Sequence, residues 1–461
     1  MNTGFARSTG QRVGASLKAS FVLPLLFLGV GGQAPIVMAQ SGGTFTSTGN
    51  MTKGRSGHTA TLLADGRVLI AGGLFDGTAE LYDPATGTFT ATGNMTTVWV
   101  NHTATLLPDG RVLIEGRSLD ALASAELYDP STGKFTAAGS ITTSGNIGGV
   151  DAAAALADGR VLIAGGPVGA VLYDPGTSTF TAAGDPAPIG FPTATLLPDG
   201  RALFASFFAS QLYEPPTGKF SLTGAQAGYE SRATLLTSGK VLVTGGNDDP
   251  GPAADAEVYD PSTGSFRPTG NMNAFRSNHT ATLLLDGTAL ITGGDSWTEG
   301  GYGYYYCCLA TAELYDTLTG RFTNTGSMVR GRAGHTATLL KSGKVLIAGG
   351  SGGSNTAELY NPGVEVPAPT VRIVDNDTGS LTTLAVGDSF SFQVTGAPPL
   401  SLVSVSEAGW SASVGYTDAS GLFWLNGTVG SNVVGTWQQT WTIGGVSAQP
   451  GPLQFTIIPK P

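Results

Sequence analysis

The sequence predicts an all-β protein, with a seven-bladed β-propeller followed by a small β-sandwich. One unit recurs seven times, and a tyrosine marks each copy: Tyr82, Tyr128, Tyr173, Tyr213, Tyr259, Tyr315 and Tyr360. The mean spacing of about 46 residues is typical of propeller blades. Each copy contains four strand patterns, and their alternation argues against a helical repeat.

The first segment is typical of an export signal. Arg7, Arg12 and Lys18 precede an apolar run at 21–30, which is too short to span a bilayer. Small residues at 37–39 predict cleavage after Ala39. We therefore expect residues 1–39 to be a signal peptide and the protein to be secreted, extracellular or periplasmic. No later segment is apolar for long enough to predict a membrane span.

The charge of the chain argues against some partners. The leader holds three bases and no acid, which leaves 20 basic and 33 acidic residues and a net charge of −13. This charge disfavours nucleic acids and anionic membrane surfaces. Hydrophobic residues make up 41% of the chain in a regular pattern, which argues against disorder.

The unit is clearest at 58–95. HTATLL alternates and ends at Asp-Gly, a strong hairpin turn, and RVLIAGG reads as a strand buried on both faces. AELYDP alternates again and runs into a second tight turn, and TFTATG is a final alternating strand. We name these strands a, b, c and d, from the axis of the propeller outward.

The two ends of the repeat region predict how the ring closes. The seventh unit stops after strand c at 357–362, and an extra strand d stands at 43–51 before the first complete unit. Pairing of these two segments would complete blade seven and protect both edges. We therefore assign residues 40–363 to the propeller.

Several short motifs of the unit resemble kelch repeats. They are R-x-x-H, the Asp-Gly turn, Gly-Gly after strand b and Tyr-Asp-Pro on strand c. In strand d the usual tryptophan is replaced by phenylalanine: Phe89, Phe135, Phe180, Phe220, Phe266 and Phe322. The resemblance implies a kelch propeller, a fold that serves many functions.

The repeat ends at Pro362. Residues 364–369 read as a stiff linker, and 370–461 contain alternating segments such as DSFSFQV and GTWQQTWTI. These patterns predict an immunoglobulin-like β-sandwich, here without the usual disulfide. A propeller followed by such a domain resembles the galactose oxidase architecture.

That resemblance implies a copper held by two tyrosines and two histidines, one of them in the C-terminal domain, with a tyrosine crosslinked to an isolated cysteine. No histidine follows His335, and the two cysteines are adjacent. The copper site therefore cannot be carried over, and we expect no cofactor. No catalytic motif stands out, although distant loops of a propeller can build an active site.

Loop lengths indicate which end of the ring binds a ligand. The b–c loops vary from 2 to 17 residues, whereas the a–b and c–d turns are nearly uniform. The b–c and d–a loops share one end, where we expect recognition. Candidate ligand-binding residues in the longest loop, 295–311, and outside it are Trp297, Tyr302, Tyr304, Tyr305, Tyr306, Cys307, Cys308 and Trp99.

The paired cysteines point to three alternatives. In an oxidising compartment Cys307 and Cys308 are predicted to form a vicinal disulfide, which would stiffen the loop and offer a flat plate beside the tyrosines. The bond could instead be a purely structural lock, or two free thiols could bind a soft metal.

All histidines occupy one repeat position: His58, His102, His279 and His335. Imidazoles on contiguous blades suggest a weak metal candidate. Each of these blades also has a glutamate in strand c: Glu80, Glu126, Glu313 and Glu358. This co-occurrence favours a structural His–Glu or His–backbone hydrogen bond.

Arg55, Arg276 and Arg332 stand three residues before three of the histidines. They either pair with a neighbouring blade or form a positive pocket for a carboxylate or a sulfated glycan. Taken together, the sequence predicts a secreted, monomeric recognition protein for an extracellular glycan or protein. The alternative is an extracellular carbohydrate-active enzyme or oxidoreductase with its site at the same end.

Overall fold

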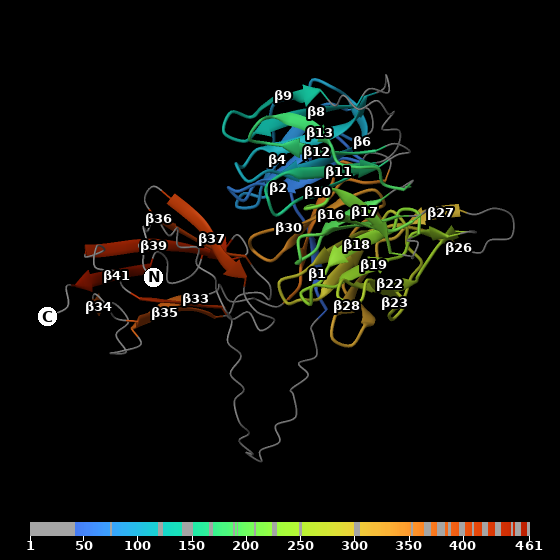
Figure 1. The fold of residues 1–461 in the computed structure, drawn as a ribbon. Coiled ribbons are helices and arrows are strands. Elements are labelled where there is room, and N and C mark those ends of the chain that lie inside the picture. Colours follow the sequence, from blue (N-terminus) through green and yellow to red (C-terminus); the bar gives the residue numbers. More distant parts are fainter. Residues whose placement is uncertain are drawn as a thin grey trace, which may run out of the picture. The chain divides into compact units, whose positions relative to one another are not determined.

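The computed structural model consists of strands, turns and loops, and none of its described residues lies in a helix (Figure 1). The described residues are 42–73, 76–118, 123–140, 151–165, 169–187, 190, 192–206, 209–223, 228–248, 251–298, 305–351, 354–363 and, further along the chain, 370–375, 383–385, 389–395, 402–407, 410–416, 423–428, 435–443, 446–447 and 453–458. Within these ranges no helix is long and apolar enough to cross a membrane.

Seven four-stranded antiparallel sheets form the blades of the propeller. From strand a to strand d, blade one is β2 (Thr59–Leu62), β3 (Val68–Ala71), β4 (Ala79–Asp83) and β5 (Thr88–Ala91); blade two is β6 (Trp99–Leu106), β7 (Val112–Ser118), β8 (Ala123–Asp129) and β9 (Lys134–Ser140); blade three is β10 (Asp151–Ala155), β11 (Val161–Gly165), β12 (Ala170–Asp174) and β13 (Thr179–Ala182). Blade four is β14 (Thr193–Leu196), β15 (Ala202–Ala205), β16 (Gln211–Glu214) and β17 (Lys219–Leu222); blade five is β18 (Arg232–Leu235), β19 (Val241–Thr244), β22 (Ala256–Asp260) and β23 (Ser265–Pro268); blade six is β24 (Thr280–Leu283), β25 (Ala289–Thr292), β28 (Ala312–Asp316) and β29 (Arg321–Asn324); blade seven is β30 (Thr336–Leu339), β31 (Val345–Ala348), β32 (Ala357–Asn361) and β1 (Thr44–Ser47).

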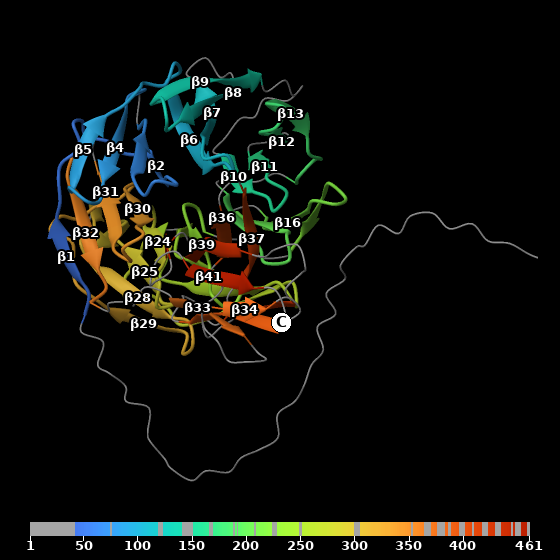
Figure 2. The ribbon, with the colours of Figure 1, turned by 90° about the vertical axis from the view of Figure 1, so that its left-hand side faces the viewer.

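The ring closes as the repeat predicts. Each strand a contacts strand a of the next blade, from β2 through β6, β10, β14, β18, β24 and β30 and back to β2 (Figure 2). Strand β1 pairs with β32, with Thr44 opposite Asn361 and Ser47 opposite Glu358. The segment at the start of the repeat region therefore completes blade seven, which confirms the seven-bladed propeller.

Burial explains the strand patterns. Strand b is buried along its whole length in blade one, as its apolar run requires. The core is divided into clusters between neighbouring blades, and the cluster between blades one and two joins Leu69 and Leu81 to Val112 and Tyr128. The turn between strands a and b depends on Gly66, whose φ of 92° suits glycine best.

Two b–c loops contain an extra hairpin. One is β20 (Asn247–Asp248) with β21 (Gly251–Pro252) in blade five, and the other is β26 (Asp295–Thr298) with β27 (Tyr305–Cys308) in blade six. Strands β21 and β26 contact each other, so the two hairpins lie side by side. The end of the ring predicted to vary therefore carries additional structure at these blades.

The chain beyond the propeller also forms β-sheets. One sheet has the order β33-β35-β38, and a second has the order β34-β41-β39-β36-β37 with β40 paired to β39. Their bounds are β33 (Thr370–Asp375), β34 (Thr383–Ala385), β35 (Ser389–Thr395), β36 (Leu402–Glu407), β37 (Trp410–Tyr416), β38 (Phe423–Thr428), β39 (Gly435–Ile443), β40 (Val446–Ser447) and β41 (Leu453–Ile458). The immunoglobulin-like topology stays a prediction, as do the leader at 1–39 and the linker at 364–369, which lie outside the described residues.

Candidate functional site

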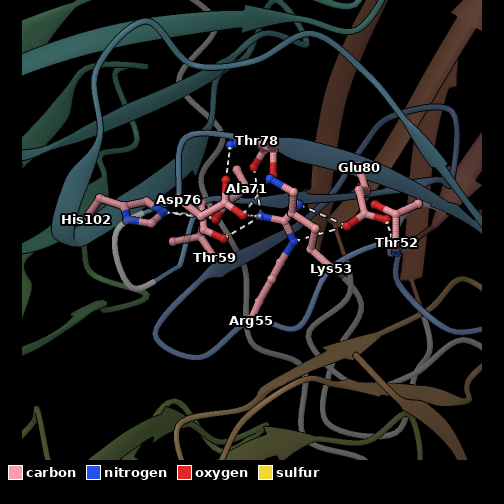
Figure 3. Close-up of polar contacts among 10 residues, drawn as sticks. Thr52, Lys53, Arg55, Thr59, Ala71, Asp76, Thr78, Glu80 and His102 are labelled. Atoms are coloured by element: carbon pink, nitrogen blue, oxygen red, sulfur yellow. Dashed lines mark hydrogen bonds and ion pairs between the residues drawn. The ribbon is translucent and has the colours of Figure 1, made fainter. Parts of the chain in front are cut away.

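Arg55 is a structural residue of blade one. Its guanidinium contacts Glu80 Oε1 through Nε at 3.2 Å and through Nη2 at 2.9 Å. Nη1 donates to the carbonyls of Gly72 and Thr78 at 2.6 and 2.8 Å, and Nη2 donates to Thr78 Oγ1 at 2.8 Å (Figure 3). These bonds use all five N–H donors of the guanidinium, and the side chain is buried.

Blades six and seven repeat the same arrangement. Arg276 pairs with Glu313 and Arg332 pairs with Glu358, in both cases at 2.9 Å, and each arginine makes the corresponding bonds to a glycine carbonyl and a threonine. Both arginines are buried. No N–H of the three arginines is left for an anion, so the positive pocket suggested at Arg55, Arg276 and Arg332 is wrong.

The histidines connect neighbouring blades. His58 Nε2 lies 3.0 Å from Thr336 Oγ1, and His102 Nε2 donates to the Ala71 carbonyl at 3.0 Å (Figure 3). His279 and His335 make the same kind of contact: His279 Nε2 lies 2.9 Å from a threonine hydroxyl, and His335 Nε2 lies 3.1 Å from two of them. The predicted structural role is therefore confirmed, and His102 makes the His–backbone bond that was one of its two predicted forms. The other form, a His–Glu bond, is wrong because the glutamates of blades one, six and seven bind arginine instead.

Burial keeps these imidazoles neutral. It lowers the pKa of His58 and His335 to about 3, and it also lowers the pKa of His102 and His279. Within the described part of the chain, no three His, Cys, Asp or Glu side chains lie together in a way that could hold a metal ion. Each histidine instead contacts a different neighbouring blade.

Trp99 takes the place of the arginine in blade two. It stands three residues before His102, is fully buried, and donates from Nε1 to Ser124 Oγ at 3.0 Å. With no arginine present, Glu126 accepts hydrogen bonds from the backbone and hydroxyl of Thr96. Trp99 is thus a core residue, and its prediction as a ligand contact is wrong.

The blade-six loop is described through its backbone only at most of the candidate positions. Trp297 is paired with Tyr306 in the β26–β27 hairpin, and Tyr305 belongs to the same hairpin. Tyr302 and Tyr304 lie outside the described residues, as do the side chains of Trp297, Tyr305, Tyr306 and Cys307. Their role in ligand binding stays a prediction.

Cys308 ends the hairpin as a free, exposed thiol. Its sulfur accepts a hydrogen bond from Ser351 Oγ at 3.0 Å. The vicinal disulfide with Cys307 is therefore not formed in this structure, since regular strand pairing holds both residues in an extended backbone. Formation of the bond in an oxidising compartment stays a prediction, which alkylation of the unreduced, denatured protein would test.

A set of half-buried polar residues, missed in the sequence, lies where blades five and six meet at the b–c end. We call Glu230, Asn247, Asn278 and Asp295 the polar cluster. Asn247 Nδ2 donates to Glu230 Oε2 at 3.2 Å, and Asn278 Nδ2 donates to Asp295 Oδ2 at 3.3 Å. The Asn278 side chain also acts on the Glu230 carboxyl, whose pKa it lowers. Backbone bridges join the residues that begin the two hairpins to the preceding d–a loops.

Two members of the polar cluster have a strained backbone. Glu230 and Asn278 have φ of 62° and 51°, at the repeat position where blades one and seven have Gly57 and Gly334 with φ of 64° and 61°. A non-glycine residue in this region costs about 1–2 kcal/mol, with asparagine tolerating it better. Because such strain concentrates at functional sites, Glu230 is a candidate functional residue. The signal was readable as a glutamate replacing a repeat glycine.

The surroundings of the polar cluster raise the pKa of its two carboxyl groups, Glu230 and Asp295. Burial raises the pKa of Asp295. Burial also raises the pKa of Glu230, and the negative charge of Asp295 adds to this effect, whereas Arg232 and the Asn278 hydrogen bond oppose it. Raised carboxyl pKa values are a feature of binding and catalytic sites.

A concave region lies at the opposite end of the ring from the polar cluster, between the turns of blades three and four. Its volume is about 510 Å³, and Leu156, Asp199, Arg201 and Pro216 are among the residues that line it. Arg201 and Asp199 form an ion pair at 2.6 Å there. Asp158, which also lines the hollow, pairs with Arg160, so most of its charged groups have partners of their own. The polar cluster, with its strained backbone, is the better candidate site.

Comparison with known proteins agrees with this architecture. Residues 232–273, which span blade five, match the family model of the Kelch motif. No curated protein matches the chain. A similar solved structure is a fungal alcohol oxidase of the AA5 family in complex with copper; it is 15% identical, covers 91% of this chain and 99% of that chain, and has a TM-score of 0.59. At this identity the likeness shows the fold alone.

Proposed function

We propose that this Kelch-motif propeller is a recognition protein that binds a glycan at the polar cluster, on the end of the ring that carries the b–c and d–a loops. One observation carries the proposal: Glu230 occupies a left-handed backbone position that glycine fills in blades one and seven. The ring would be more stable without this strain. Its presence is explained if the carboxylate serves a ligand.

The chemistry of the polar cluster suits a ligand rich in hydroxyl groups. Carboxylates accept hydrogen bonds, and carboxamides both donate and accept them, as sugar hydroxyls do. The four side chains are half-buried, so they line the surface without being sealed in the core. Phe275, which stands three residues before Asn278, is 51% exposed and offers an apolar face of the kind that packs on a sugar ring.

The substitution Glu230→Gly tests the proposal. We expect it to raise the free energy of unfolding by up to about 1 kcal/mol because the backbone strain is relieved. We expect the same substitution to weaken glycan binding by about tenfold or more because a half-buried hydrogen-bonding group is lost. Urea unfolding and titration against a glycan array measure the two effects.

Glu214→Asp is the matched control, since Glu214 is the exposed last residue of β16, at the opposite end of the ring, where most other blades have aspartate. This control should leave both the free energy of unfolding and the affinity for the glycan unchanged. A Glu230→Gly protein that binds the same glycans as the parent, or a parent that binds no glycan at all, would contradict the proposed function.

The second candidate function is catalysis at the same site, as an extracellular carbohydrate-active enzyme or oxidoreductase. It is favoured by the raised pKa values of Glu230 and Asp295, which suit general acid–base work. Turnover assays on sugars and alcohols, with and without added copper, separate this function from binding alone. Loss of turnover in Glu230→Gln would assign the activity to the polar cluster.

We also propose that the protein is exported after cleavage of residues 1–39 and acts as a monomer, with the C-terminal domain as a spacer or second contact. The basic and apolar leader supports export. N-terminal sequencing of the protein recovered outside the cell would test the cleavage site. Light scattering would test the monomeric state.

A further inference from the structure

Arg232 departs from the repeat at the start of strand a in blade five. The same position holds threonine in most blades, as in Thr59, Thr193, Thr280 and Thr336. In blades one, six and seven this threonine contacts the histidine of the next blade. Arg232 therefore places a guanidinium where the other blades have a neutral hydroxyl.

The surroundings of Arg232 differ from those of the structural arginines. Arg55, Arg276 and Arg332 each pair with a glutamate at 2.9 Å. Among the side chains that the structure describes, no carboxylate lies within 4.0 Å of the Arg232 guanidinium, which donates from Nη1 to the Ser231 carbonyl at 3.2 Å. Burial lowers the pKa of Arg232, and the charge of Glu230 opposes this effect.

Arg232 is the first residue of β18, opposite Thr244 of β19, and β18 contacts β24 of blade six. The charge of Arg232 acts on groups of the neighbouring blades. It lowers the pKa of His279 in blade six and of His335 in blade seven. It also lowers the pKa of Glu230, a member of the polar cluster. Arg232 thus stands on a strand that contacts blade six, two residues along the chain from Glu230 of the polar cluster.

We propose that the ligand is an acidic sugar whose carboxylate binds Arg232 while its hydroxyls bind the polar cluster. This inference rests on the proposed function. A partly buried guanidinium without a carboxylate partner is costly, and a carboxylate of the ligand would satisfy it through two parallel hydrogen bonds.

The charge of the site selects among acidic ligands. Glu230 and Asp295 repel negative groups, so a doubly charged phosphate or a densely sulfated sugar is disfavoured. A uronic acid carries one carboxylate for Arg232 and several hydroxyls for the acceptors of the polar cluster. The substrate class that best fits the site is therefore a uronate-containing oligosaccharide.

The substitution Arg232→Thr restores the residue of the other blades and is expected to fold. Its binding is measured by calorimetry to an oligogalacturonate and to an oligoglucuronate, and to the methyl ester of each, which has the same rings without the charge. We expect the parent protein to bind the acid at least about tenfold more tightly than the ester. We expect Arg232→Thr to lose this preference while binding the ester as before.

The outcomes separate this inference from the proposed function. If acid and ester bind equally to the parent, or if Arg232→Thr keeps the preference, the role of Arg232 is wrong and glycan recognition stands. If the parent binds neither form nor any neutral sugar on the array, the proposed function itself fails. Glu214→Asp serves again as the control that should leave all affinities unchanged.

Discussion

At the scale of single residues, the buried histidines make the ring sensitive to acid. The pKa of His58 and of His335 is about 3 in the folded protein and 6.5 in the unfolded chain. The Nδ1 atoms of all four histidines are buried, with no partner among the described atoms. Their stabilising contribution is therefore complete above pH 6.5 and is lost as the pH falls from 6.5 toward 3.

We predict that each of these two histidines costs about 1.4 kcal/mol of stability per pH unit within that window. The charges that act on His335 are Arg332, Arg232, His58 and Arg276, all unfavourable to the imidazolium. Urea unfolding of the parent and of His335→Gln at pH 7 and pH 5 measures the effect. The parent should lose about 2 kcal/mol more than the variant.

The buried carboxyl of Glu115 has the opposite effect on the pH dependence of stability. Burial raises its pKa from 4.5 to about 7 although Thr103 Oγ1 donates to it at 2.6 Å. This group destabilises the fold above pH 7 and ceases to do so as the pH falls toward 4.5. The comparison of parent with variant cancels its contribution. Equal losses in the two proteins would contradict the role of His335.

Sequence reasoning found the conserved features of the unit but not their partners. The co-occurrence of histidine and glutamate suggested a bond between them, because spacing along the repeat does not say which blade a side chain faces. The structure shows that Glu80 binds Arg55, whereas His102 reaches back to Ala71 of the preceding blade. Arg232 and Glu230 were not found because both positions vary among the blades, so a departure there did not stand out from ordinary repeat variation.

At the scale of strands, a hydrogen bond joins strand d of one blade to strand c of the next. Thr92 Oγ1 lies 2.9 Å from Tyr128 OH, and three other blade pairs repeat the contact: Thr48 with Tyr82, Thr269 with Tyr315, and Thr325 with Tyr360. In blade two the threonine is replaced by Ala138. The hydroxyl of Tyr173 in blade three is accordingly buried, with no partner among the described atoms.

We predict that Ala138→Thr stabilises the protein by about 1 kcal/mol because it satisfies this hydroxyl. Ala138 and Tyr173 belong to the same buried cluster, and Ala138 stands at the position from which threonine contacts tyrosine in other blade pairs. Thermal unfolding measures the change. In the parent, Tyr173→Phe should be nearly neutral, whereas in the Ala138→Thr background it should be destabilising. A stabilisation that survives Tyr173→Phe would have another cause.

At the scale of the whole molecule, the fold was largely predictable because propeller blades consist of local hairpins. Each repeat contains its own turn residues and the alternating apolar pattern of its strands. The count of seven followed from the tyrosines, and the closure followed from an orphan strand at 43–51. The polar cluster was not predictable in the same way. It joins Glu230 and Asn247 of blade five to Asn278 and Asp295 of blade six, and one sequence does not show that these loops meet.

We predict that the ring depends on β1. Phe45 packs on Tyr360 with ring centroids 4.9 Å apart, and Thr48 Oγ1 lies 2.9 Å from Tyr82 OH in blade one. A chain that begins at residue 42 should unfold as the parent without its leader does. A chain that begins at residue 53 should lose at least about 2 kcal/mol of stability, because an apolar ring and a whole strand are removed. Thermal unfolding of both chains measures this difference, and equal midpoints would contradict it.

The pairing of β1 with β32 also imposes an order on the synthesis and folding of the protein. Thr46 contacts Leu359, which lies 313 positions further along the chain. Strand β1 is therefore synthesised long before β32, and it cannot pair until the last blade has left the ribosome. Six blades can form as local hairpins meanwhile, with blade seven open on one side. The final folding step of the ring is therefore the pairing of β1, which is synthesised first, with β32, which is synthesised last.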